Sequence, residues 1–347
     1  MQTVYVGLSG GVDSSVSAAL LKERGFNVVG VYMKNWTQDI GGVACPWAED
    51  LADARAVAAV LDIPFKIFDF QAEYRRQVVD IMVSEYRAGR TPNPDVLCNQ
   101  DIKFKLFLDA ALVDGADFIA TGHYARTVNG QLLMARDNNK DQTYFLYRVS
   151  AKALRKTIFP VGELPKSQVR AIAAKFKLPT ATKPDSQGIC FVGEVGIKSF
   201  LEQYVETSSG PVVCHGEVVG THDGAIFYTI GQRHGLGIGG GKPYYVTAKD
   251  MATNTVFVTD DPHDLSLETA SFGLEQTHWI AGEPELAKTY MIRIRHLGRL
   301  TPCTLKQIEP GDWRVVLSEP ERAVAAGQSA VIYDGEVALG GGLIITP

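Results

Sequence analysis

The sequence predicts an α/β fold with a doubly wound parallel sheet, followed by a small β-rich central domain and a C-terminal β-barrel. Strand-like apolar runs alternate with helical periodicity from Thr3 to Ala125, which is typical of a parallel sheet covered by helices on both faces. From Gly210 onward, short strand patterns separated by turns replace this alternation. The 347 residues suffice for two or three domains, which we place at residues 1–204, 205–272 and 273–347.

The individual elements follow from apolar patterning. Four runs rich in Val, Ile, Phe and Tyr predict buried strands at residues 4–8, 27–33, 65–70 and 117–122. Helical periodicity lies between and after them, at Ser14–Arg24, Ala48–Leu61, Ala72–Ala88, Lys103–Asp114, Lys166–Phe176 and Ile197–Val205. Gly and Pro turns at the spacing of a small barrel separate the last expected strands, at Tyr290–Arg295, Thr304–Ile308, Trp313–Leu317, Ala330–Tyr333 and Leu343–Thr346.

Composition excludes several classes of protein. With 46% hydrophobic and 21% charged residues, the chain is neither disordered nor fibrous. Its apolar runs are too short to cross a bilayer, and Met1–Gly7 leads into a strand without a cleavable leader, so we expect a soluble cytoplasmic protein without a membrane partner. Five scattered cysteines do not form a secreted disulfide framework, and no spacing typical of a protein-held metal site is present.

Charge is unevenly distributed along the chain. The net charge of −5 argues against a protein that coats nucleic acid through a basic exterior. Residues 151–200, however, carry nine Lys or Arg against three acidic side chains. This segment is either a footprint for a polyanion or a solvated helix face, and charge alone does not decide between them.

The turn after the first strand carries the strongest chemical signal. It reads Ser9-Gly10-Gly11-Val12-Asp13-Ser14-Ser15 and runs straight into an amphipathic helix, so that glycine backbone, hydroxyl donors and a helix N-terminus converge on one anion site. The string SGGVDSS matches the PP-loop, the pyrophosphate-binding motif of enzymes that form adenylates from ATP. It lacks the lysine of the Walker loop, which disfavours transfer of the γ-phosphate. Asp13 adds negative charge, which a bound Mg²⁺ would reconcile with phosphate.

Other glycine and cysteine segments are less decisive. The stretch Gly235–Lys242 fits no phosphate-binding pattern and is interpreted as a flexible loop. Cys98 and Cys190 both lie in segments containing Pro or Gly, which we expect to be polar loops, with no helix until Lys103 in the case of Cys98. Each is either a reactive thiol or a small buried side chain. Cys214 and Cys303 lie in strand patterns and fit the second description; Cys45 remains undecided.

The whole set of motifs resembles the bacterial tRNA-specific 2-thiouridylase family. The resemblance runs from Thr3 to Ile344, and its most specific parts are TPNPDVLCN around Cys98 and DSQGIC around Cys190. Members of this family use ATP to replace the 2-oxygen of the wobble uridine of certain tRNAs with sulfur. Their architecture is a PP-loop catalytic domain, a small central domain and a C-terminal β-barrel, which is the arrangement predicted from the residue patterns.

The resemblance implies a role for particular residues. Cys190 carries a persulfide, Cys98 opens its S–S bond and leaves a Cys98–Cys190 disulfide, and Asp95 handles protons. A cysteine desulfurase or sulfur-relay protein supplies the sulfur, and a reductant opens the disulfide. The residues implied to bind ATP are Gly7, Leu8, Ser9, Gly10, Gly11, Val12, Asp13, Ser14, Met33 and Gly122. Those implied to bind the target base or tRNA are Asn93, Pro94, Asp95, Lys140, Asp141, Gln142, Arg295 and His296.

Other functions remain open at this stage. A different PP-loop ligase that uses ammonia or an amine would have no need of Cys98 and Cys190. A tRNA-binding module without catalysis would carry these cysteines as structural residues. An iron–sulfur site built from Cys45, Cys98 and Cys190 is disfavoured by their spacing. His123, beside Gly122, is either a phosphate donor or a structural residue at the end of a strand.

Overall fold

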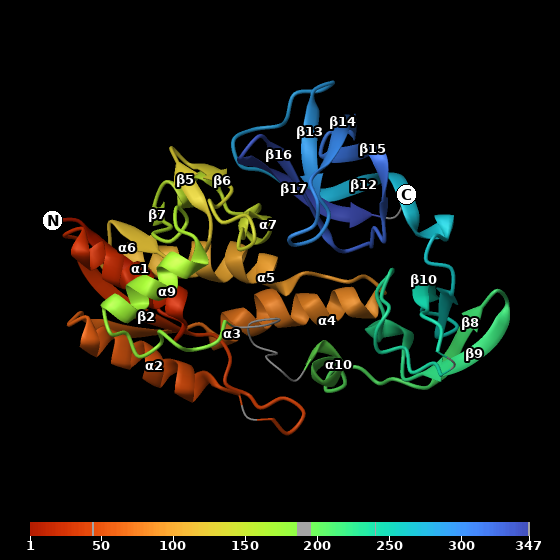
Figure 1. The fold of residues 1–347 in the computed structure, drawn as a ribbon, viewed down its shortest axis with the longest axis horizontal. Coiled ribbons are helices and arrows are strands. Elements are labelled where there is room, and N and C mark those ends of the chain that lie inside the picture. Colours follow the sequence, from red (N-terminus) through yellow and green to blue (C-terminus); the bar gives the residue numbers. More distant parts are fainter. Residues whose placement is uncertain (44, 186–195, 240, 346–347) are drawn as a thin grey trace.

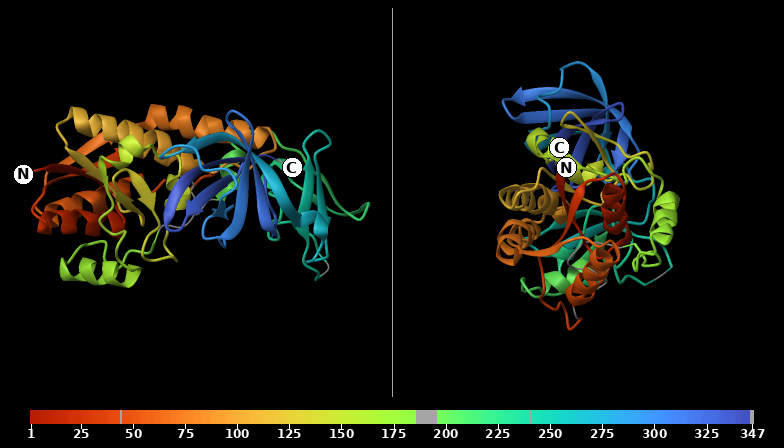
Figure 2. Two further views of the ribbon diagram at one scale, coloured as in Figure 1. Left: turned by 90° about the horizontal axis from the view of Figure 1, so that it is seen from above. Right: turned by 90° about the vertical axis from the view of Figure 1, so that its left-hand side faces the viewer.

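Figure 1 shows the computed structural model of the chain, which describes residues 1–43, 45–185, 196–239 and 241–345. The α/β domain occupies one end, the β-rich central domain lies at the other, and the C-terminal barrel packs over the region between them. The view from above in Figure 2 shows the resulting elongated shape. In the described part of the chain, no helix has the length and apolar character needed to cross a membrane.

The first domain is built on the predicted parallel sheet. Its five strands run in the order β3-β2-β1-β4-β7, and every neighbouring pair is parallel. The reversal of strand order beside β1 creates the switch point at which α/β sheets bind ligands. The bounds of the strands are β1 (Thr3–Gly7), β2 (Asn27–Lys34), β3 (Phe65–Asp69), β4 (Phe118–Ala120) and β7 (Thr157–Ile158). Only β7 lacks a counterpart among the predicted strands.

Helices cover both faces of this sheet, because alternate side chains of each strand enter different cores. Val4 and Val6 of β1 pack in one apolar cluster with α1, α2 and α9, whereas Tyr5 packs in the other with the helices from α3 to α6. The first group comprises α1 (Val12–Glu23), α2 (Trp47–Val60) and α9 (Lys166–Lys175). The second comprises α3 (Gln71–Tyr74), the π-helix η1 (Arg75–Val79), α4 (Asp80–Arg87), α5 (Pro94–Leu97), the π-helix η2 (Cys98–Leu106) and α6 (Phe107–Val113). Three short helices complete the domain: α7 (Thr143–Leu146), α8 (Ala151–Leu154) and α10 (Gly196–Leu201).

The expectation of a loop around Cys98 is wrong. Helix α5 begins at Pro94 and continues without a break into η2, which contains Cys98. Pro94 is tolerated because it occupies the first turn, where a backbone N–H has no helical acceptor anyway. Asn93 caps the helix by accepting a hydrogen bond from the backbone N–H of Asp95 at 3.2 Å. Cys98 therefore lies on a helix and is 2% exposed, within the apolar core.

The central domain is a four-stranded sheet with a small core of its own. Its strands run in the order β10-β11-β8-β9, with bounds β8 (Gly210–Cys214), β9 (Glu217–His222), β10 (Tyr245–Asp250) and β11 (Thr255–Thr259). Two 3₁₀ turns, η4 (Ala225–Phe227) and η5 (Leu265–Leu267), flank the sheet. The described residues of Gly235–Lys242 form turns and loops, as expected.

The barrel closes through pairing of its first and last strands, β12 and β17. Its strands are β12 (Glu268–Trp279), β13 (Thr289–Arg293), β14 (Thr301–Glu309), β15 (Asp312–Arg322), β16 (Ser329–Asp334) and β17 (Val337–Ile345). The boundary expected after residue 272 falls inside β12. A hairpin of the first domain, β5 (Arg126–Val128) and β6 (Gln131–Leu133), adds to β17 and joins the two domains through backbone hydrogen bonds.

Candidate active site

The glycine-rich turn forms an anion cradle at the carboxyl end of β1. Gly11 is the N-cap of α1, whose first-turn N–H groups point toward the turn. The hydroxyl groups are already arranged: Ser14 Oγ accepts from the backbone N–H of Ser9 at 3.2 Å and lies 3.2 Å from Ser9 Oγ. Ser15 Oγ donates to the carbonyl of Gly11 at 2.7 Å, and Thr180 Oγ1 donates to Ser15 Oγ at 2.9 Å. These hydrogen bonds hold the hydroxyl groups and the backbone of the turn in one arrangement.

Two glycines allow the backbone to pack closely around this turn. Gly10 has φ +76°, and a Cβ there would lie 2.7 Å from the carbonyl oxygen of Asp50. Gly122 follows β4, and a Cβ there would lie 2.5 Å from the backbone nitrogen of Ser14. Met33, at the end of β2, approaches Gly7 from the opposite side. The structure thus brings Met33, Gly122 and the turn to one edge of the sheet, where the sequence predicted an ATP site.

Asp13 is held by two donors. Its carboxylate accepts from Lys166 Nζ at 2.7 and 2.8 Å and from the hydroxyl group of Tyr124 at 2.8 Å. Burial, reinforced by the charge of Asp13, raises the pKa of Tyr124, so this hydroxyl group remains a neutral donor. A lysine thus already compensates the negative charge that the sequence alone left unexplained.

A second carboxylate, Asp185, gathers three cations beside Asp13. Lys140 Nζ lies 2.7 Å from Oδ2, while Lys166 Nζ and Arg170 Nη2 lie 2.8 and 2.6 Å from Oδ1. Although burial alone would raise it, the hydrogen bonds from Lys140 and Lys166 lower the pKa of Asp185 to about 2. We refer to Asp13, Lys140, Lys166, Arg170 and Asp185 as the cation cluster. Sequence reasoning gave no role to Tyr124 or to Asp185. Asp185 begins the DSQGIC motif, but a motif does not show which distant side chains its residues contact.

The cation cluster corrects one expectation about the basic segment. Lys166 belongs to residues 151–200, which the sequence left as either a polyanion footprint or a solvated helix face, but it is 15% exposed and faces Asp13 and Asp185. Lys183, also in that segment, is paired with Asp50 and Asp53 of α2 at 2.8 and 2.6 Å. Among the described residues of this segment, the exposed basic side chains are those of Lys152, Arg155, Lys156, Lys175, Lys177 and Lys198.

Residues of the Cys98 helix meet the barrel through α7. Asn99, next to Cys98, donates to the carbonyl of Phe145 at 3.2 Å. The Phe145 ring packs against His296 of the barrel with ring centroids 4.4 Å apart. Burial lowers the pKa of His296, which favours a neutral ring that can stack. Arg295 beside it is exposed, and its guanidinium lies 3.8 Å from Glu321.

The expectation that Asp141 contacts tRNA conflicts with its position. Asp141 is fully buried and accepts from Arg293 Nη1 at 2.6 Å, from Thr143 Oγ1 at 2.7 Å and from the backbone N–H of Ala135 at 2.9 Å. An acidic side chain sealed in this way cannot touch a solvated polyanion, so Asp141 is a structural residue. Its neighbours Lys140 and Gln142 are partly exposed, although Gln142 Oε1 also accepts from the backbone N–H of Tyr124 at 2.9 Å.

His123 is placed as a structural residue. Its Nδ1 lies 2.8 Å from Thr121 Oγ1, and its ring packs edge-on against Phe159 and tilted against Phe104. Burial, with a smaller contribution from the charge of Lys103, lowers the pKa of His123 well below its ordinary value. A neutral ring among aromatic side chains does not supply charge to a phosphate.

Apart from Cys98, the structure describes Cys45, Cys214 and Cys303. Cys190 lies outside the described residues. The iron–sulfur alternative includes Cys190, so the structure does not test it. Cys303 is buried in β14, where burial raises the pKa of its thiol to about 12. Burial also raises the pKa of Cys45, whose Sγ lies 3.9 Å from the carbonyl of Trp36.

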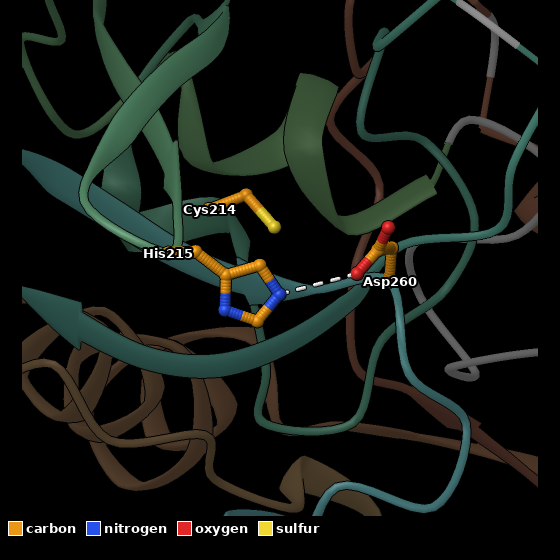
Figure 3. Close-up of side chains that lie close together, drawn as sticks. All are labelled: Cys214, His215 and Asp260. Atoms are coloured by element: carbon orange, nitrogen blue, oxygen red, sulfur yellow. Dashed lines mark hydrogen bonds and ion pairs between the residues drawn. The ribbon is translucent and has the colours of Figure 1, made fainter.

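Cys214, by contrast, has polar neighbours in the central domain (Figure 3). In the described part of the chain, Cys214, His215 and Asp260 form a group whose ligand atoms lie within 4.8 Å of one another. The Asp260 carboxylate is already occupied, by His215 Nε2 at 3.2 Å and by Lys242 Nζ at 3.1 Å. Burial raises the pKa of the Cys214 thiol, which opposes the thiolate that a metal requires. Ion pairing accounts for this group without a metal.

The parallel sheet, the anion cradle at its switch point and the attached barrel define the class, a PP-loop nucleotide-binding protein with two accessory β domains. Three protein-family models match successive parts of the chain. They are described as tRNA methyl transferase HUP domain (residues 2–194), tRNA methyl transferase PRC-barrel domain (residues 198–260) and Aminomethyltransferase beta-barrel domain (residues 269–344).

Curated relatives narrow the class to a family. The chain is 47% identical to the tRNA-specific 2-thiouridylase MnmA of Nitrosomonas eutropha, with 98% of each chain covered. It is 49% identical to the protein of the same name from Neisseria meningitidis serogroup B, covering 99% of this chain and 95% of that one. A solved 4-thiouridine synthetase–RNA complex with bound ATP aligns with a TM-score of 0.39 and 16% identity, over 58% of this chain and 50% of that chain. The chain belongs to the tRNA-specific 2-thiouridylase family.

Proposed function

We propose that the chain catalyses ATP-dependent 2-thiolation of the wobble uridine of tRNA. The main support for this proposal is the anion cradle at Gly7–Ser14. This cradle lies in a chain that aligns over almost its whole length with curated tRNA-specific 2-thiouridylases. The adenine lies between Met33 and Gly122, which flank the cradle at the edge of the sheet. Asp13 is the residue that would hold Mg²⁺, because the ion prefers hard oxygen ligands, and the ion would supply positive charge next to the phosphates.

Two cysteines divide the sulfur transfer between them. A cysteine desulfurase or relay protein loads sulfur onto Cys190, and the terminal sulfur attacks C2 of the adenylated uracil, which displaces AMP. Cys98 then attacks the sulfur of Cys190, so that the S–S bond breaks and its electron pair stays with the sulfur on the base. A reductant opens the resulting Cys98–Cys190 disulfide. Asp95, one helical turn before Cys98 in α5, is close enough in sequence to take part in proton transfer.

The target nucleotide must leave its stack to reach these groups, because neighbouring bases obstruct C2. Asn93, Pro94 and Asp95 contact the base at the N-terminus of α5. Lys140 and Gln142, together with Arg295 and His296 of the barrel, contact the tRNA around it. The packing of His296 on Phe145, whose carbonyl accepts from Asn99 beside Cys98, supports a tRNA surface continuous with the cysteine helix.

Single cysteine variants test the proposal. With a desulfurase, cysteine, ATP and tRNA, the wild-type protein releases pyrophosphate and forms 2-thiouridine. Cys190→Ser accepts no persulfide, whereas Cys98→Ser accepts one on Cys190 and stalls, because a serine hydroxyl stays protonated where a thiol partly ionises. Mass spectrometry of tryptic peptides locates the extra sulfur. Cys303→Ser is the matched control, since Cys303 is a buried strand cysteine. Normal thiolation by either Cys98→Ser or Cys190→Ser would remove the paired-cysteine mechanism.

A further inference from the structure

The glycine-rich turn lacks the lysine that steadies phosphates in Walker loops, yet a lysine reaches it from another part of the chain. Lys166 is the first residue of α9 and lies 153 positions after Asp13. Its ammonium group lies 2.7 and 2.8 Å from the two carboxylate oxygens of Asp13, in the first turn of α1. The side chain is only 15% exposed, so the ammonium is directed at the turn rather than at solvent.

Asp185 and Arg170 fix the position of this lysine. Asp185 Oδ1 lies 2.8 Å from Lys166 Nζ and 2.6 Å from Arg170 Nη2, one turn further along α9. Arg170 Nη1 also donates to the carbonyls of Ala181 and Lys183, at 2.8 and 2.6 Å. The segment that presents Asp185 is therefore attached to the same helix as Lys166, and the ammonium has a defined location before ATP binds.

The three cations of the cluster lie beside the anion cradle. Lys140, Lys166 and Arg170 carry three positive charges against the two negative charges of Asp13 and Asp185. Two of these cations, Lys140 and Arg170, are partly accessible to solvent, with exposed fractions of 37% and 29%. The Asp137 carboxylate, which accepts a hydrogen bond from the backbone N–H of Lys166 at 3.0 Å, adds a third negative charge nearby. The placement of the three cations beside the anion cradle, rather than a surplus of charge, favours an anionic ligand.

We propose that Lys166 is a pyrophosphate-binding residue of the adenylation step and that Asp185 is its positioning residue. When ATP occupies the cradle, Lys166 exchanges the Asp13 carboxylate for β- or γ-phosphate oxygens and keeps its contact with Asp185. Asp13 retains the Tyr124 hydroxyl group and becomes available to Mg²⁺. This inference rests on the proposed function, because it assigns a residue to the ATP half-reaction of that same site.

The chemistry requires such a cation. The uridine 2-oxygen attacks the α-phosphorus, the bond between that phosphorus and the α–β bridging oxygen breaks, and pyrophosphate leaves with the electron pair. Negative charge therefore builds up on the departing phosphates. The positive charge of Lys166 offsets this charge, so the effect of Lys166 falls on the rate of pyrophosphate release more than on the affinity for ATP.

Single-turnover pyrophosphate release at saturating ATP and tRNA measures this effect. We expect Lys166→Met to slow release about 100-fold or more, by analogy with the loss of one preorganised donor, while ATP affinity changes less than about tenfold. Asp185→Asn should also slow release, by about tenfold, since the lysine then keeps only its contact with Asp13. Lys66→Met is the matched control, because Lys66 pairs with Asp114 near the opposite edge of the same sheet.

The outcomes separate this inference from the function on which it depends. Wild-type protein that releases no pyrophosphate with tRNA would contradict the proposed function itself. Normal release by a folded Lys166→Met protein, as judged by its melting temperature, would overturn the role of Lys166 alone. So would weaker tRNA binding with a smaller salt dependence and unchanged release, because Lys166 would then be a tRNA contact.

Discussion

The neighbouring residues Lys140 and Asp141 belong to two different groups of charged side chains. Lys140 is part of the cation cluster, Asp141 pairs with Arg293, and the two groups differ in burial and in the number of charges they contain. Asp141 and Arg293 are 0% and 7% exposed, and they balance each other one to one across the interface with the barrel. Asp13 and Asp185 contact three cations, Lys140, Lys166 and Arg170, and remain 30% and 23% exposed. The buried pair joins the first domain to the barrel, whereas the partly exposed cluster, whose cations solvent can reach, is suited to bind an anion.

The largest expected effect is a loss of folding stability when the buried Asp141–Arg293 pair is broken. Arg293→Met leaves the Asp141 carboxylate buried without its counter-ion, which typically costs about 3–5 kcal/mol. We expect a fall in melting temperature of several degrees, measured by calorimetry or circular dichroism. Lys288→Met, which removes an exposed barrel ion pair with Asp334, is the control and should change the melting temperature little. Equal shifts for the two variants would mean that the buried pair does not hold the barrel.

The second prediction concerns the backbone of the cradle. In Gly122→Ala, the new Cβ would lie 2.5 Å from the backbone nitrogen of Ser14 and must displace the first turn of α1. We expect ATP affinity to fall about tenfold or more, a change of ~1.4 kcal/mol, by calorimetric titration. Gly239→Ala, where a Cβ would meet no atom within 4 Å, should bind ATP normally. Unchanged affinity in a folded Gly122→Ala protein would place the nucleotide elsewhere.

The third prediction distinguishes surface cations from those of the cluster. Neutral replacements at Lys152, Arg155 and Lys156, all exposed, should weaken tRNA binding. Each lost phosphate contact lowers the slope of log affinity against log salt by ~0.7–0.9, so the slope should fall by about two. Lys166→Met should leave this slope unchanged. Filter binding across a salt series measures both, and an unchanged slope in the triple variant would make this segment a solvated face.

Local patterns predicted the sheet, its helices and the cradle, because each depends on neighbouring residues. They failed where distant residues decide, and also at two places where a local signal was present but was not used. Charge counting could not show that Lys166 faces Asp13, since that pairing exists only after α9 packs on α1. The β5–β6 hairpin was also missed, although Asn129-Gly130 between short apolar runs is a recognised hairpin signal. Two nearby prolines outweighed the capping pattern at Asn93, so the Cys98 helix was interpreted as a loop.

The smallest expected effect tests whether His123 belongs to the structure rather than to the phosphate site. Burial holds its pKa well below the ordinary value in the folded protein, while the unfolded chain takes up a proton near pH ~6.5. Its contribution to stability is therefore fully present above that pH and is lost as the pH falls, by at most ~1.4 kcal/mol per pH unit. In His123→Phe, a non-titrating ring among the same aromatic neighbours, the melting temperature should fall less between pH ~7 and ~5.5 than in the wild-type protein. His234→Phe, at an exposed position, should follow the wild-type curve. A difference between His123→Phe and wild type that does not vary with pH would show that the imidazole is not kept neutral by burial, and would return His123 to the candidates for phosphate binding.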